Sequence, residues 1–185
     1  MELIESQLKE NMERVSSLSV TALTLIKQVA SSYTSELDEL MQSIYTDVVS
    51  KDQPPVMMIE KHFLNLSDCL YMMGEKLESL GVYSSMSNAS YKEVYNEKYL
   101  SIPDTISDSK KKLTVADMTA LTENATKYES VTSDIYSKAY KIVKSKVESA
   151  TTMLSTLSKI LSRRMSEMQL NSVAPSGRQI LNEVI

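Results

Sequence analysis

The chain has 185 residues and a formal net charge of −4, which argues against a globally basic nucleic-acid-binding protein. Three glycines and four prolines allow few turns and predict an all-α protein, while the single cysteine cannot form an intrachain disulfide and favours a reducing, cytoplasmic location. One histidine and one cysteine exclude the usual multi-histidine and cysteine-cluster metal sites, and no glycine-rich phosphate loop is present. We therefore expect no metal, no cofactor and no enzymatic activity. No run of about 18 apolar residues occurs, so no membrane-spanning segment is expected.

The first predicted element is a long helix over residues 2–50. Apolar residues recur every three or four positions from Ile4 to Val48, which places them on one face of a helix. Pro54-Pro55 ends this helix and begins the next, because proline fits the first turn of a helix but not its interior.

Two shorter helices are predicted next, over residues 55–80 and 90–100. The first keeps the apolar spacing and is followed by Gly81, a residue typical of a helix C-terminal cap. Ser90 and Glu93 form a capping-box pattern, which predicts the start of the second.

A polar loop is predicted from Pro103 onward, and the longest helix follows it over residues 114–169. Thr114 and Asp117 form a capping pattern at its start, and no glycine or proline interrupts it. Pro175-Ser-Gly is predicted to break the chain again.

The domain organisation follows from these elements. Residues 1–170 are predicted to form a single elongated helical domain, and residues 171–185 a C-terminal tail. The tail carries four large apolar residues at helical spacing, which is unusual for a disordered end and predicts a docking segment. These residues are Ile180, Leu181, Val184 and Ile185.

The length of the last helix predicts self-association. At ~1.5 Å per residue it would measure about 80 Å, whereas a compact domain of this chain length has a radius of gyration of about 16 Å. The helix must therefore protrude, lie in an elongated bundle or coiled coil, or pack against copies of itself, and we expect a homo-oligomer. The apolar seam expected to join the copies contains Leu121, Ile135, Val143, Val147, Leu154, Leu157 and Leu161.

One polar pattern suggests a binding function. Between Lys138 and Arg164 there are seven basic residues and one acid, Glu148. At ~100° per residue, most of the bases fall opposite the apolar stripe, so they could follow a phosphate backbone. They could equally form a solvated face or pair with acids of the first helix. The candidate nucleic-acid-binding residues are Lys138, Lys141, Lys144, Lys159 and Arg163, with Lys110, Lys111 and Lys112 of the preceding loop.

Three tyrosines at i, i+4 and i+8 accompany this pattern, namely Tyr91, Tyr95 and Tyr99. Their rings could stack on unpaired bases, or they could form an ordinary packed helix face. His62, next to Phe63 in an apolar helical context, is interpreted as a structural residue and not as a ligand or a base.

The last half of the chain resembles phage recombination mediators of the UvsY type. The resemblance lies in Tyr95-Asn-Glu-Lys-Tyr99, a polar loop, Leu113-Thr-Val-Ala-Asp, and one long helix that ends Met153-Leu-Ser-Thr-Leu-Ser-Lys-Ile-Leu-Ser-Arg-Arg164. The chain differs from that family in its long N-terminal helix pair, its acidic total charge and the lack of a clear basic pair before the tyrosines. The resemblance implies a small oligomeric single-stranded-DNA-binding protein that helps to load a recombinase onto strands covered by a single-strand-binding protein.

A second function is compatible with the same helices. The chain could be a coiled-coil scaffold or assembly protein that acts through protein–protein contacts without nucleic acid. The two functions differ in whether the basic residues bind phosphate, and DNA affinity should then fall steeply with salt.

Overall fold

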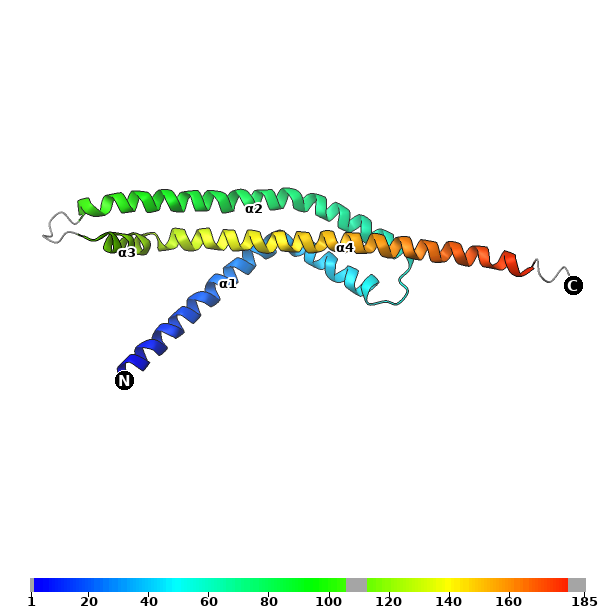
Figure 1. Cartoon of the computed structure of the whole chain (residues 1–185), viewed down its shortest axis with the longest axis horizontal. Helices are drawn as coiled ribbons and strands as arrows, with labels where there is room; N and C mark the ends of the chain where they lie inside the picture. The colour runs from blue at the N-terminus through cyan, green and yellow to red at the C-terminus, as the bar shows by residue number, and fades with distance from the viewer. Residues whose placement is uncertain (1, 106–112, 180–185) are drawn as a thin grey trace. The chain divides into compact units, whose positions relative to one another are not determined.

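The structure is a computed structural model that describes residues 2–105 and 113–179, with side chains for residues 19–102 and 113–170. These residues contain helices and no strand, which confirms the predicted all-α fold (Figure 1). The elements are α1 (Glu2–Ile44), the π-helical turn η1 (Tyr45–Val49), α2 (Val56–Thr105), α3 (Val115–Ala125) and α4 (Lys127–Gln179).

The two shorter helices expected between residues 55 and 100 are one continuous helix, α2. Gly81 is therefore not a cap, and its φ is not positive. A Cβ at Gly81 would lie 3.3 Å from the ring of Tyr140, so the glycine provides room for that ring. Ser90 likewise lies inside the helix, because packing along its whole length outweighs a local start signal.

The predicted helix start at Thr114 is confirmed. The Thr114 hydroxyl accepts a hydrogen bond from the Asp117 N–H at 3.2 Å, and Asp117 Oδ2 accepts one from the Thr114 N–H at 3.1 Å. The long helix is interrupted once, at Thr126, whose N–H still donates to the Thr122 carbonyl at 2.9 Å.

Two predicted breaks are wrong. Pro103 lies within α2, which ends at Thr105, and Pro175 lies within α4, which ends at Gln179. The apolar end of the predicted docking tail, residues 180–185, lies outside the described residues, as does the loop of residues 106–112.

The chain divides into two compact units. The first contains Met1–Tyr33 and Lys76–Lys144, and the second contains Thr34–Glu75 and Ser145–Ile185. The predicted domain boundaries, 1–170 and 171–185, stay predictions.

In the second unit, α1 and α2 are antiparallel neighbours joined through η1. Asp47 in η1 contacts His62 near the start of α2, while Leu40 of α1 and Cys69 of α2, further from the turn, line one groove. Buried residues recur seven positions apart on each helix, a 3.5-residue period that is typical of coiled coils. They are Leu37 and Ile44 on α1, Ile59, Leu66 and Met73 on α2, and Ala150 and Leu157 on α4.

In the first unit, α2 and α4 lie side by side in antiparallel directions (Figure 1). Tyr83 stacks on Tyr136 with ring centroids 6.0 Å apart, and Gly81 faces Tyr140. The core of this unit is made largely of small and hydroxylated side chains. They are Ala30, Thr122, Thr126, Ser133 and Ala139, and the larger buried side chains of this unit include Ile26, Leu80 and Val143.

Candidate nucleic-acid interface

Three of the predicted phosphate-binding residues lie on the outer side of α4 in the first unit. Lys138, Lys141 and Lys144 are exposed, whereas Ala139 and Val143 between them are completely buried. Within the described part of the chain, none of the three lysines forms an ion pair. Their ammonium groups are therefore available to a phosphate backbone, and we call these three residues the lysine ridge.

The other two helix residues of the predicted set lie in the second unit. Lys159 is exposed, and the Arg163 side chain is 82% exposed. Arg163 Nε donates to Glu167 Oε1 and Arg164 Nη1 donates to Glu167 Oε2, both at 2.9 Å, and these hydrogen bonds lower the pKa of Glu167. Glu167 therefore offsets part of the charge that Arg163 would offer to a phosphate. Lys110, Lys111 and Lys112 lie outside the described residues.

Lys146 pairs with the first helix, which was one of the alternatives for the basic residues. Its Nζ donates to Asp38 Oδ2 at 2.5 Å and to the Thr34 hydroxyl at 3.0 Å. The Thr34 hydroxyl donates in turn to Asp38 Oδ2 at 2.9 Å, which satisfies this completely buried residue. Lys146 thus connects α4 to α1, and the lysine ridge does not include it.

Most of the exposed hydroxyl groups in the described part of α4 are bonded to their own helix. Each of these donates to the carbonyl oxygen four residues earlier, at 2.9–3.3 Å for those of the second unit named below, an arrangement that serine and threonine commonly adopt inside helices. The residues that do so in the second unit include Ser149, Thr151, Thr152, Ser155, Thr156 and Ser162.

The predicted tyrosine series packs against itself. Tyr91, Tyr95 and Tyr99 are each half-buried, with successive ring centroids 6.0 Å and 6.4 Å apart. Ser87 and Ser90 of α2 line a groove with Tyr128, Glu129 and Thr132 of α4. Because the two helices are antiparallel, the tyrosines beyond Ser90 lie away from the lysine ridge. The structure therefore favours a packed helix face for these rings and does not bring them to the lysines.

The predicted oligomer seam is used largely inside the chain. Val143 and Leu157 are completely buried by the chain itself. Ile135, Val147, Leu154 and Leu161 are half-buried, and Leu121 is 43% exposed. Of this seam, Leu121 is the member that the chain leaves most open.

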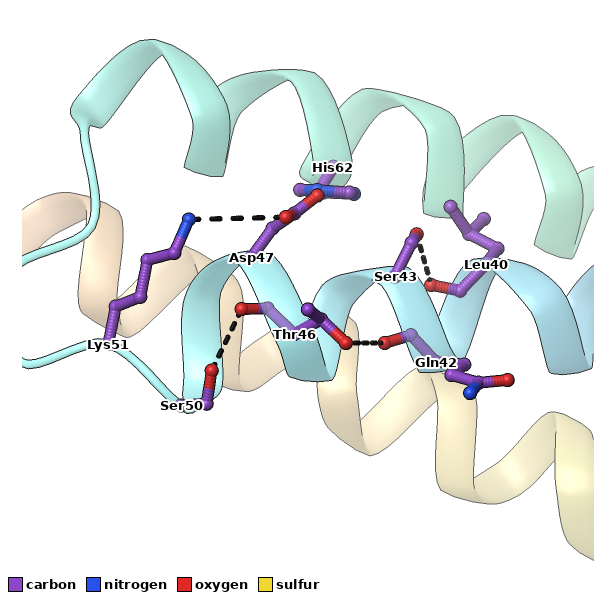
Figure 2. Close-up of polar contacts among 8 residues, drawn as sticks. All are labelled: Leu40, Gln42, Ser43, Thr46, Asp47, Ser50, Lys51 and His62. Atoms are coloured by element: carbon purple, nitrogen blue, oxygen red, sulfur yellow. Dashed lines mark hydrogen bonds and ion pairs between the residues drawn. The ribbon is translucent and has the colours of Figure 1, made fainter.

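A buried histidine stabilises the turn between α1 and α2 (Figure 2). His62 is 5% exposed, and its Nε2 lies 3.0 Å from Asp47 Oδ2. Lys51 Nζ lies 4.0 Å from the other carboxylate oxygen of Asp47. The π-helical turn places Asp47 there: the Ser50 N–H donates to the Tyr45 carbonyl five residues earlier at 2.9 Å. The pair joins η1 to α2, and its sequence signal is an acid and a histidine on either side of Pro54-Pro55.

The described residues hold no group of three side chains that could bind a metal ion. No helix among them is long and apolar enough to cross a membrane.

Comparisons with protein-family models, with curated proteins and with solved structures found no significant match.

Proposed function

We propose that this protein is a non-enzymatic single-stranded-DNA-binding accessory protein, and the observation that supports this most directly is the lysine ridge. Lys138, Lys141 and Lys144 are exposed, lie on one side of α4, and have no acidic partner among the described residues. A binding role fits this arrangement because each ammonium group is solvated and can replace a counterion on a phosphate.

The spacing of the lysine ridge suits a flexible strand. Residues three apart on a helix rise by about 4.5 Å, so three lysines cover about 9 Å along α4, and their long side chains can reach neighbouring phosphates. Three phosphate contacts predict a slope of log affinity against log salt of about −2 for single strands. Binding by one chain is therefore weak, and repetition of the ridge in an assembly strengthens it.

The test is a fluorescence-polarisation titration with labelled single-stranded and duplex oligonucleotides at several salt concentrations. The variant Lys138→Gln, Lys141→Gln, Lys144→Gln should lose single-strand binding and keep its helix content. A matched control, Lys61→Gln, Lys92→Gln, Lys98→Gln, removes the same charge from exposed positions on α2. The control should retain most of the binding. Absence of binding by the native chain at low salt, or equal loss in both variants, contradicts the proposal.

The finer role, mediation of recombination in a phage-infected cytoplasm, is proposed from the resemblance to UvsY-type mediators. It predicts contacts with a recombinase or with a single-strand-binding protein. Recombinase loading onto a strand covered by the single-strand-binding protein should be faster with the native chain than with the lysine-ridge variant. Equal loading rates contradict this role without affecting DNA binding itself.

A scaffold function is the second candidate, and the exposed apolar side chains favour it. Within the described residues, twenty large apolar or tyrosine side chains are more than 40% exposed, among them Met57 at 80% and Tyr71 at 85%. Contiguous exposed apolar surface commonly marks protein–protein interfaces. Association through such surfaces should persist at high salt, whereas DNA binding should be lost.

A further inference from the structure

Beside the core of the first unit, α3 and α4 carry a second apolar stripe. Leu121, Tyr128, Ile135 and Ile142 are spaced seven residues apart, so they share one side of a coiled-coil helix. The stripe changes in exposure along its length. Ile135 and Ile142 are half-buried, whereas Leu121 is 43% and Tyr128 is 85% exposed.

Helix α1 carries an apolar stripe that changes in the same way. Ile26 and Ala30 are 5% and 3% exposed and lie in the core. Leu23, one turn earlier on the same side, is 55% exposed. The sequence continues this stripe to Ile4 with the same three- and four-residue spacing.

The two stripes stop being covered close to where the helices meet. Tyr33 is half-buried beside Tyr83 and Tyr136, and burial, followed by these two phenolic groups, raises its pKa. At this level α1 packs with α2 and α4. Among the described side chains, Val20 and Leu23 before Ile26 on α1, and Leu121 and Tyr128 before Ile135 on the second stripe, are exposed.

We propose that the N-terminal part of α1 from a second copy of this chain covers the exposed part of the α3–α4 stripe. Tyr136, next to Ile135 at the covered end of the stripe, lies close enough to Tyr33 of α1 to raise its pKa, so a second helix with the α1 pattern would continue an interface that already exists. Two copies that exchange these segments cover both stripes in both chains and form a closed two-fold dimer.

A second copy fits this stripe better than the chain's own α1. Ile26 and Ala30 hold α1 in the core of its own chain, at 5% and 3% exposed. One turn earlier Leu23 is 55% exposed, and Tyr128 on the stripe is 85% exposed, so the chain's own α1 leaves the open part of the stripe uncovered. A second copy supplies a helix with the same apolar pattern without any change in this packing.

The interface proposed here is independent of nucleic acid and differs from the seam expected from the sequence. Val143 and Leu157 of that seam are completely buried in their own chain. The stripe shares Leu121 and Ile135 with that seam, and of these two Leu121 lies in its exposed part.

The first test measures mass by light scattering for the full chain and for three variants. The particle formed by the native chain should have at least twice the mass of one chain. Tyr128→Lys and Leu23→Glu should each raise the dissociation constant at least about tenfold, because each places a charge in an apolar contact. Tyr71→Lys is the control, because Tyr71 is also 85% exposed but lies in the second unit. A monomeric native chain, or an equal effect of all three variants, overturns the proposal.

The second test separates exchange from closure within one chain. The Tyr128→Lys and Leu23→Glu chains are mixed, one of them isotopically labelled, and the mixed dimer is weighed by native mass spectrometry. An exchanged dimer with one chain of each variant contains two α1–stripe contacts, of which one has neither substitution and the other has both. A contact that one substitution has already broken loses little more binding free energy from the second. The mixed dimer should therefore exceed its statistical share. A statistical or smaller share shows that α1 covers its own chain and overturns the proposal.

Discussion

Leu157→Ala should destabilise the folded chain itself, whatever its state of association. Leu157 is completely buried on α4 in a structure that contains one chain, so neighbouring segments of that chain cover it. Replacing a buried leucine by alanine removes its transfer free energy and leaves a cavity, and together these cost 2–5 kcal/mol, or about 3 kcal/mol as a central value. At ~1.4 kcal/mol per factor of ten, this lowers the folding equilibrium constant more than a hundredfold. Leu157→Asp should be more severe, because it leaves an unpaired charge in the core.

The measurement is urea unfolding followed by far-ultraviolet circular dichroism at low and at high protein concentration. The decrease in the free energy of unfolding caused by Leu157→Ala should be the same at both protein concentrations, because the contacts of Leu157 lie within one chain. Met168→Ala on the same helix is the control, since Met168 is 59% exposed and its truncation should cost less than about 1 kcal/mol. A loss that disappears at high concentration would show that Leu157 joins separate chains, and the reasoning from burial would be refuted.

Two further predictions concern helix interiors and ends. Gly74→Ala should stabilise the chain by about 0.5–1 kcal/mol in thermal unfolding, because the site has no neighbour within 4 Å of a new Cβ and alanine favours the helix. Gly81→Ala should gain less or lose stability, because the Tyr140 ring must move. Hydrogen bonds from Thr114 lower the pKa of Asp117 below its ordinary 3.8. The stabilisation by the cap is therefore complete above pH 3.8 and is lost as the pH falls through the pKa of Asp117 in the folded chain. Amide hydrogen exchange at the start of α3 should then accelerate in acid beyond its intrinsic pH dependence. An exchange rate without this acceleration would contradict the cap.

The helical fold could be predicted from the sequence because apolar spacing depends only on which side of a helix is buried. The apolar stripe from Ile4 to Val48 is an example. The cap at Thr114 could also be predicted, because it depends on two residues that are close in sequence. The spacing does not say which segment covers the apolar face of a helix. Val143 and Leu157 were therefore compatible with an intermolecular seam and equally with an internal core.

The remaining features depend on contacts between segments distant in sequence. Gly81 and Ser90 carry local signals for a helix end and a helix start, but the approach of Tyr140 explains the glycine instead. The Asp47–His62 pair requires the register of α1 against α2, which a one-residue change in the π-helical turn would alter. For the candidate site, the outward position of the lysine ridge followed from helical periodicity. The pairing of Lys146 with Asp38 was an open alternative that only the packing of α4 on α1 could decide.

The hydroxyl groups along α4 affect how this helix could discriminate between partners. Each hydroxyl that donates its proton to its own helix presents only lone pairs to solvent, as Ser149 and Thr152 do. A phosphate oxygen also carries lone pairs, so such a hydroxyl gives it no hydrogen bond, and neutralisation of a strand falls to the ammonium groups. Base edges meet few donors on this surface. A strand bound to α4 would therefore be selected by its density of charge, with little preference for one base sequence over another.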